Sequence, residues 1–250
     1  MRSPLRYPGG KTRAVKILRA YVNRFYHGRT TLLSPFLGGG SFELAMLDDG
    51  YKLIANDLFV PLVTFWNSDH AQVAQVVRAH MPVSKERFRE LRNNITTMEP
   101  VEQAAAYFVI NRCSFSGATF CGGFSAQASD GRLNEAAVKR LEQTPRLAIS
   151  NMDCCAFLDA NPESRDALVY ADPPYYITNY MYGKDGDLHE SFDHEALARK
   201  LMQRRDWILS YNDCEYIRNL YRGCRIFEEN WSYGMNASKQ SSEVIILPPV

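Results

Sequence analysis

The sequence feature that most restricts the fold is an apolar run that two prolines stop. Ala167-Leu168-Val169-Tyr170-Ala171 has the composition of a buried strand, and Asp172-Pro173-Pro174-Tyr175 follows directly. Neither proline can donate to a sheet ladder and both fix φ, so the strand ends in a rigid turn. Because ligands bind at the carboxyl ends of strands in open α/β sheets, the run predicts a site at this turn.

The groups in this turn suit a planar ligand that carries an amine. The Asp172 carboxylate and the Pro173 carbonyl can each accept one hydrogen of an NH2 group, while Tyr175 can stack on the ring. Pro174 adds rigidity. The alternative is a proline-rich loop that only ends a strand.

Length and composition favour one α/β domain with a sizeable insertion. The chain has 250 residues, of which 46% are apolar and 23% charged, as in an ordinary soluble globular protein. No run approaches the roughly 18 apolar residues of a membrane span, and we expect no signal peptide. The six cysteines form no CxxC pair. We therefore expect reduced thiols, no metal and a cytoplasmic location.

Charge is distributed unevenly along a chain whose net charge is only +1. Such an asymmetry can give one face a positive field that attracts nucleic acid. A solvated helix face would explain it equally well. The basic residues that precede the first acidic residue, Glu43, are Arg2, Arg6, Lys11, Arg13, Lys16, Arg19, Arg24 and Arg29.

A loop around Gly9-Gly10 leads into a helix predicted from Lys11 to about Tyr26. A glycine loop at a helix N-terminus can bind an anion or a carboxylate, and Lys11 adds positive charge. The spacing of a Walker loop is absent. Tyr7, considered alone, is as well explained by packing.

A second glycine turn follows the first predicted strand, residues 30–36. Strand, glycine turn and helix are how a parallel sheet lets backbone approach a nucleotide-like ligand. The dinucleotide fingerprint requires a third glycine where Glu43 stands, which disfavours NAD and FAD. What remains is the spacing of Phe36, Gly38 and Gly40.

The second predicted strand, residues 52–55, ends at Asn56-Asp57. An acidic residue about 20 positions after the glycines, at the end of the second strand, can accept both hydroxyls of a ribose. Asp57 fits this position. A surface aspartate is the alternative.

The alternation of strands and helices stops between residues 62 and 143. Helical patterns cover 62–80, 85–95, 101–113 and 133–141, which predicts a mainly helical insertion. Residues 114–131 form a long loop that contains Phe115, Phe120 and Phe124. These aromatic rings could stack on bases or pin the loop to its own domain.

The α/β pattern resumes with a strand at 147–150, followed by Asp153. Further strands are predicted at 207–211, 225–227 and 244–247, and a helix at 193–205. The last two strands are expected to form a hairpin against an otherwise parallel sheet.

The order of these motifs resembles the DNA adenine-N6 methyltransferases of the D12 class, specifically the Dam-type (alpha-group) subgroup. In that subgroup cofactor motifs come first and a target-recognition domain is inserted before the catalytic motif. The resemblance extends over nearly the whole chain, and the similar segments are 6–11, 35–42, 56–58, 172–175, 210–212 and 232–243.

The resemblance implies a class I methyltransferase (Rossmann-like) fold with a mostly parallel sheet and a final antiparallel hairpin. Residues 1–61 and 144–250 would form the catalytic domain, and residues 62–143 an inserted helical target-recognition domain. The implied cofactor is S-adenosylmethionine. Its methionine end would lie by Tyr7 and Lys11, its ribose hydroxyls on Asp57 and its adenine amine on Asp153; the rest of the implied cofactor site is Phe36, Gly38, Gly40 and Asp172.

The expected chemistry is direct transfer of a methyl group to adenine N6. Two acceptors, Asp172 and Pro173, would favour a pyramidal nitrogen whose lone pair points at the sulfonium methyl. No cysteine is needed as a nucleophile. The target base must leave the duplex, which costs a few kcal/mol that stacking on Tyr175 would partly offset.

The expected substrate is double-stranded DNA, and the candidate DNA-binding residues are Arg112, Phe120 and Lys239. Asn111-Arg112 and Gly117 resemble the start of the Dam-type recognition loop, but the following residues depart from it. No Arg or Lys lies between Arg112 and Arg132, so we do not predict recognition of GATC. Arg112 itself could be a base reader or a structural arginine.

Three other functions compete with this interpretation. They are an amino-methyltransferase acting on RNA, cytosine N4 or a protein glutamine, a non-catalytic nucleic-acid-binding module, and a nucleotide-dependent oxidoreductase. The first residue of the tetrad, Asp172, resembles the adenine enzymes, and Glu43 disfavours the oxidoreductase. A cognate restriction endonuclease is a possible functional partner, and a monomer is favoured.

Overall fold

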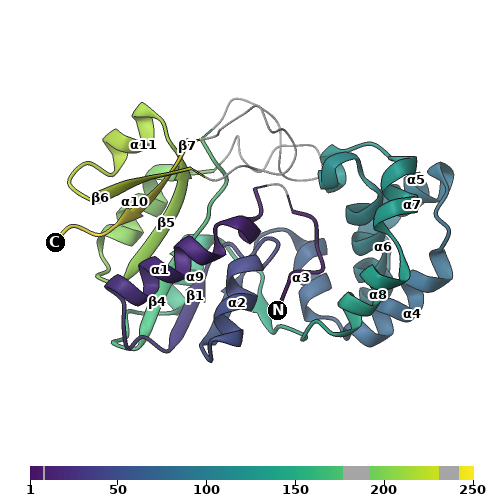
Figure 1. Cartoon of the computed structure of the whole chain (residues 1–250), viewed down its shortest axis with the longest axis horizontal. Helices are drawn as coiled ribbons and strands as arrows, with labels where there is room; N and C mark the ends of the chain where they lie inside the picture. Colours follow the sequence, from purple (N-terminus) through teal and green to yellow (C-terminus); the bar gives the residue numbers. More distant parts are fainter. Residues whose placement is uncertain (8, 177–191, 231–241) are drawn as a thin grey trace.

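The protein is built on one seven-stranded sheet, seen at the left of the computed structural model in Figure 1. The structure describes residues 1–7, 9–176, 192–230 and 242–250. Its strands are β1 (Thr31–Ser34), β2 (Lys52–Asn56), β3 (Ile149–Ser150), β4 (Ala167–Ala171), β5 (Trp207–Asn212), β6 (Arg225–Asn230) and β7 (Ser242–Leu247).

The strand order is β3-β2-β1-β4-β5-β7-β6. The first five strands in this order run parallel, and β7 is antiparallel to both β5 and β6. This confirms the predicted class I methyltransferase fold and its final antiparallel pair. The chain goes outward from β1 to β3 and then returns to β4 beside β1, so a topological switch point lies between β1 and β4.

Helices cover both faces of the sheet, which explains why its strands are continuous apolar runs. On one face, α1 (Val15–Phe25) and α2 (Ser41–Asp48) pack on Leu32 and Leu168. On the other face, Leu33 and Val169 pack against helices of the second half of the chain, α9 (Cys154–Ala160), α10 (His194–Met202) and α11 (Glu215–Leu220).

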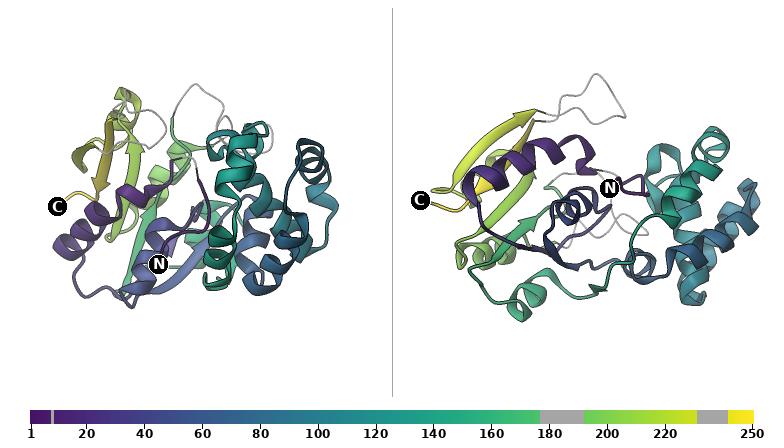
Figure 2. Two further views of the ribbon diagram at one scale, coloured as in Figure 1. Left: turned by 45° about the vertical axis from the view of Figure 1, so that its right-hand side comes forward. Right: turned by 60° about the horizontal axis from the view of Figure 1, so that its bottom comes forward.

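Only helices and turns lie between β2 and β3, in agreement with the predicted helical insertion (Figure 2). The α-helices are α3 (Val60–Asn67), α4 (His70–His80), α5 (Lys85–Asn94), α6 (Pro100–Cys113), α7 (Ala126–Arg132) and α8 (Glu135–Glu142). From Gln103 to Cys113 every residue of α6 is buried, so α6 is the central helix around which the block packs.

Two details of the insertion correct the sequence prediction. The helical pattern over 62–80 is divided into two helices, because Ser68 is extended and Asp69 caps α4 by accepting from the amides of Ala71 and Gln72. The loop expected over 114–131 contains two 3₁₀ turns, η3 (Phe115–Gly117) and η4 (Thr119–Cys121), and all of α7 except its last residue.

One hydrophobic core crosses from the sheet into the helical block. Leu37 and Leu44, from the glycine turn and α2, belong to the same buried cluster as Phe65 of α3 and Phe108 of α6. In addition, the Trp66 Nε1–H donates to the Gly38 carbonyl at 3.0 Å. The predicted division into two domains at residues 61 and 144 stays a prediction.

Within the described parts of the chain, no helix is both long enough and apolar enough to cross a membrane.

Candidate active site

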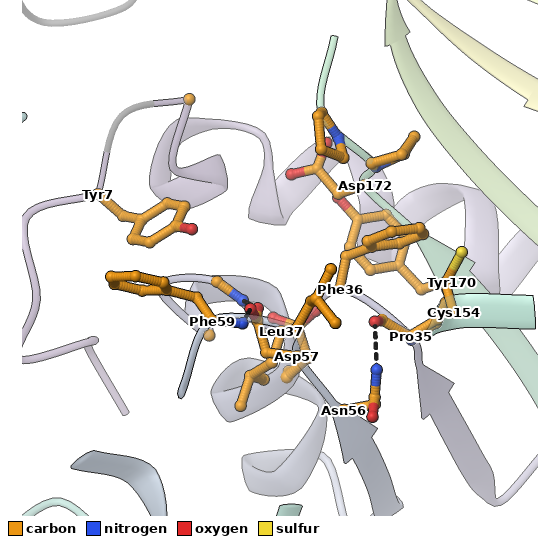
Figure 3. A pocket seen from close by; sticks show the side chains of 18 of the residues that line it. Tyr7, Pro35, Phe36, Leu37, Asn56, Asp57, Phe59, Cys154, Tyr170 and Asp172 are labelled. Atoms are coloured by element: carbon orange, nitrogen blue, oxygen red, sulfur yellow. Dashed lines mark hydrogen bonds between the residues drawn. The ribbon is translucent and has the colours of Figure 1, made fainter. Parts of the chain in front are cut away.

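A pocket opens at the carboxyl ends of β1, β2 and β4, at the switch point of the sheet. Figure 3 shows Tyr7 and Phe59 on one side of it and Tyr170 and Asp172 on the other. The pocket brings together the predicted glycine turn, acidic strand end and Asp-Pro-Pro turn. It is lined by Tyr7, 9–11, 35–43, 56–59, 152–154, Tyr170, 172–174 and Phe192.

The backbone of the glycine turn lies in close contact with the Tyr7 side chain. Gly38 has φ 51°, and a Cβ atom there would lie 3.0 Å from Cε1 of Tyr7. A Cβ atom on Gly39 would lie only 2.7 Å from Cβ of Tyr7. Gly40 has φ 63° and approaches Trp66 in the same way. Glycine at these positions therefore lets the N-terminal segment lie directly on the turn.

Asp57 lies at the end of β2 and is fixed by backbone amides. Its Oδ2 accepts from Gly38 N at 2.9 Å, and its Oδ1 accepts from Phe59 N at 3.0 Å. Burial raises the pKa of Asp57, and these amide hydrogen bonds oppose that rise. The carboxylate thus connects the glycine turn to β2 while it lines the pocket.

Asp153 borders the pocket beyond the end of β3. Its Oδ1 caps α9 by accepting from Cys155 N at 2.8 Å and Ala156 N at 3.1 Å. The side-chain ligand atoms of Asp153, Cys154 and Cys155 lie within 4.8 Å of one another. Burial raises the pKa of both thiols, which disfavours the thiolates that a metal requires.

The Asp172 carboxylate is held by two donors on one oxygen. Lys11 Nζ and Ser210 Oγ each lie 2.7 Å from Oδ1. Among the described residues, the ion pair with Lys11 and the hydrogen bond from Ser210 both fall on Oδ1. Lys11 is only 4% exposed, and its ammonium also donates to the Tyr175 hydroxyl at 2.7 Å and the Gly9 carbonyl at 3.1 Å. The predicted cofactor residue Lys11 is therefore the ion-pair partner of Asp172.

Tyr175 does not lie where a stacking role requires it. The residue is 8% exposed, its ring packs at a tilt on Tyr211, and its hydroxyl donates to Glu243 Oε2 at 2.6 Å. It does not line the pocket. The stacking role predicted for Tyr175 is thus not supported by its position, because hydrogen bonds to Lys11 and Glu243 hold the ring in the buried polar cluster.

The aromatic walls of the pocket come from other residues. Phe36, a predicted cofactor residue, lines the pocket and meets Phe192 edge-on at 5.6 Å. Phe192, Phe59 and the buried Glu43 also line it and were missed as site residues. Glu43 did stand out in the sequence, as an acidic residue at a glycine position of the dinucleotide fingerprint, whereas Phe59 and Phe192 carry no such signal.

Comparison with known families shows to which family the chain belongs. The family model for D12 class N6 adenine-specific DNA methyltransferases matches residues 7–235. The chain belongs to this family. It is therefore a DNA methyltransferase with adenine N6 as the target atom of its class. No curated protein matches the sequence.

Two residues of this D12 class methyltransferase that were predicted to contact DNA are buried and have partners within the protein. Arg112 is 9% exposed, and its Nε and Nη2 donate to the Arg132 carbonyl at 2.8 and 2.5 Å. Phe120 is 2% exposed and packs edge-on against Phe59 at 5.4 Å. Contact of either side chain with a base stays a prediction, since both are engaged inside the protein. The third candidate, Lys239, lies outside the described residues.

Between α6 and α7, the D12 class enzyme exposes Phe115, a residue that is 67% accessible. The backbone around it is tightly constrained: Phe115 N donates to Gly123 O at 2.8 Å, and Ser116 and Thr119 have φ values of 54° and 51°. Positive φ in residues other than glycine costs free energy and persists only where surrounding contacts impose it. The loop therefore presents one aromatic ring on a rigid support.

Proposed function

We propose that this chain transfers the methyl group of S-adenosylmethionine to N6 of an adenine that has been rotated out of double-stranded DNA. The observation that carries the proposal is the asymmetric anchoring of Asp172. Lys11 and Ser210 both hold Oδ1 at 2.7 Å, so Oδ2 is available to accept one hydrogen of an amine. The Pro173 carbonyl, next in the chain, would accept the second hydrogen.

The residues of the pocket fit the proposed cofactor. Asp57 retains acceptor capacity for ribose hydroxyls, since a carboxylate has about four lone-pair sites and the backbone amides that act on it are those of Gly38, Leu58 and Phe59. Asp153 retains Oδ2 for an amine, because Oδ1 alone caps α9. When bound, the cofactor would supply an electrophilic methyl group on a positively charged sulfur.

The protein's contribution to the transfer would be positioning and electrostatics. Asp172 and Pro173, by accepting both amine hydrogens, would direct the N6 lone pair at the methyl carbon. The cofactor would keep the C–S electron pair on its sulfur as N6 gains the methyl carbon, and the Asp172 carboxylate would accept the proton that N6 then loses. The anchored carboxylate would need no reorganisation as positive charge develops on N6, because its ion pair with Lys11 and its hydrogen bond from Ser210 are already made.

The helical insertion supports the choice of a Dam-type arrangement and of DNA as the substrate. It lies between the cofactor residues of β1 and β2 and the Asp-Pro-Pro turn after β4, in the order of that subgroup. Its exposed Phe115 could stack on or wedge between bases, as an aromatic ring on a DNA-binding loop does.

The test is transfer of tritium from labelled S-adenosylmethionine to unmethylated genomic DNA, with the modified base identified by mass spectrometry. We expect N6-methyladenine. Transfer to cytosine N4, or transfer only to RNA or protein, would overturn the proposed substrate. Absence of cofactor binding by the folded protein would overturn the proposed cofactor.

A further inference from the structure

Glu43 is a buried carboxyl group in the pocket to which the proposed reaction assigns no role. It lies in the first turn of α2, is 3% exposed and lines the pocket. Ser34 Oγ, at the end of β1, donates to its Oε1 at 2.9 Å. No other residue among those described donates to the carboxyl group. A buried carboxyl group with a single side-chain donor is costly in its charged form.

The charged groups around Glu43 place it at the reacting end of the pocket. Glu43 lines the same pocket as Lys11, Tyr170 and Asp172, and the charges of Asp172 and Lys11 act on it. Burial raises the pKa of Tyr170, and the negative charges of Asp172, Glu43 and Glu243 add to that rise. Among the described residues, the charged groups gathered here are the carboxyl groups of Glu43, Asp172 and Glu243 and the ammonium group of Lys11. A cation in the pocket would therefore balance its charge.

Burial raises the pKa of Glu43 to about 8, and the negative charge of Asp172 adds to this rise. Its own backbone N–H, the Ser34 hydroxyl and the positive charge of Lys11 oppose it. Near pH 7 the Glu43 carboxyl is therefore mostly protonated when the pocket holds no positively charged ligand.

We propose that Glu43 recognises the positively charged methionyl end of the cofactor and gives up its proton when that end enters the pocket. The inference rests on the proposed function, because it needs S-adenosylmethionine as the ligand. The methyl group must reach an amine held by Asp172, so the sulfonium must lie at the same end of the pocket as Glu43. An ionised Glu43 carboxylate would then face this positive charge.

A proton released on binding makes cofactor affinity depend on pH. At pH values below 8, affinity should rise by up to about tenfold per pH unit, since each bound cofactor displaces one proton. A neutral ligand of similar shape should show no such dependence. 5′-Methylthioadenosine is a suitable comparison, because it keeps the adenosine and the sulfur but carries neither the sulfonium nor the ammonium charge.

The experiment is calorimetric titration of the full chain at pH 7 in buffers of different ionisation enthalpy, which counts the protons released. We expect nearly one proton per S-adenosylmethionine for the unmodified protein and none for 5′-methylthioadenosine. Glu43→Gln should release none with either ligand. The matched control is Asp206→Asn, which changes a carboxylate paired with Arg29 away from the pocket and should behave like the unmodified protein.

Ser34→Ala provides a second variant that leaves the Glu43 carboxyl in place. Without the Ser34 donor the carboxyl is harder to ionise, so proton release should begin at a higher pH. Equal release by Glu43→Gln and the unmodified protein, or equal release with both ligands, would overturn the inference alone. If neither ligand bound the unmodified protein, the proposed cofactor and this inference would fall together.

Discussion

Lys11 and Asp172 form a 2.7 Å ion pair between the N-terminal glycine loop and the end of β4. Lys11 is 4% exposed, and the neighbouring Glu243 is fully buried with its Oε2 at 3.7 Å from the same ammonium. The two segments that the sequence suggested as separate cofactor and catalytic motifs are thus one polar cluster.

Replacement of this ammonium should destabilise the protein. Lys11→Met leaves two carboxylates without their cation, and we expect the free energy of unfolding to fall by about 3 kcal/mol or more. Denaturant unfolding measures it. The control is Arg19→Met, which removes an exposed pair with Asp49 and should cost less than about 1 kcal/mol. An equal decrease in the free energy of unfolding of the two variants would show that the buried ion pair stabilises the protein no more than the exposed one.

Ser210→Ala should slow the chemical step and leave cofactor affinity unchanged. Loss of one hydrogen bond to a charged group is worth about 1.5–3 kcal/mol, which corresponds to roughly 10- to 100-fold in the single-turnover rate. Tyr170→Phe removes only the hydroxyl that lies 3.1 Å from Ser210 Oγ, so its effect should be smaller. A Ser210→Ala enzyme that turned over normally would argue against anchoring by this serine.

Asp172→Ala should abolish methyl transfer while the fold is retained. The variant removes the acceptor for one amine hydrogen, and the Asp172 side chain is already 21% exposed, so little packing is lost. Tritium transfer to DNA measures the activity, and circular dichroism with thermal unfolding checks the fold. Near-normal methylation by a folded variant would refute the catalytic assignment.

Alanine substitutions of Phe115 and Phe120 should have different effects, the first on DNA binding and the second on stability. Phe115→Ala changes an exposed ring, so we expect unchanged stability but weaker DNA binding, by about 1–3 kcal/mol if the ring stacks on a base. Phe120→Ala opens a cavity beside Phe59 and should cost about 3–5 kcal/mol of stability. Fluorescence anisotropy with labelled duplex DNA and chemical denaturation distinguish the two effects. The reverse pattern would contradict the assignment.

Glu43 should make the stability of the ligand-free protein fall as pH rises from 5 to 8. Burial raises the folded-state pKa of this carboxyl to about 8, whereas in the unfolded chain it titrates near 4.3. Between these values the folded state binds more protons, so the contribution is fully present at low pH and is lost as pH rises. Relative to Glu43→Gln, the free energy of unfolding should fall by up to about 1.4 kcal/mol per pH unit. Parallel pH profiles for the two proteins would exclude a protonated Glu43.

The fold was predictable because its signals are local. The run 167–171 is apolar at every position, as required for a strand with helices on both faces, and its prolines mark its end. The break between α3 and α4 was also present in the sequence, since Asp69 is a typical N-cap residue.

The side-chain roles were harder to predict because distant partners decide them. Arg112 is engaged inside the protein because the Arg132 carbonyl lies beside it, and Phe120 is buried because Phe59 covers it. Tyr175 turns away from the pocket toward Glu243 on β7. No spacing within these motifs reveals such partners.

The core shared by the glycine turn and the helical block limits how this enzyme can acquire a new target sequence. Exchange of the whole insertion as a cassette would cut through the packing around Trp66, whose indole holds the Gly38 carbonyl. A transplanted block would thus disturb the glycine turn that lines the pocket together with the proposed target preference. Gradual substitution on the surface around Phe115 avoids that cost, so evolution and laboratory selection should both favour point changes in this loop over recombination at its borders.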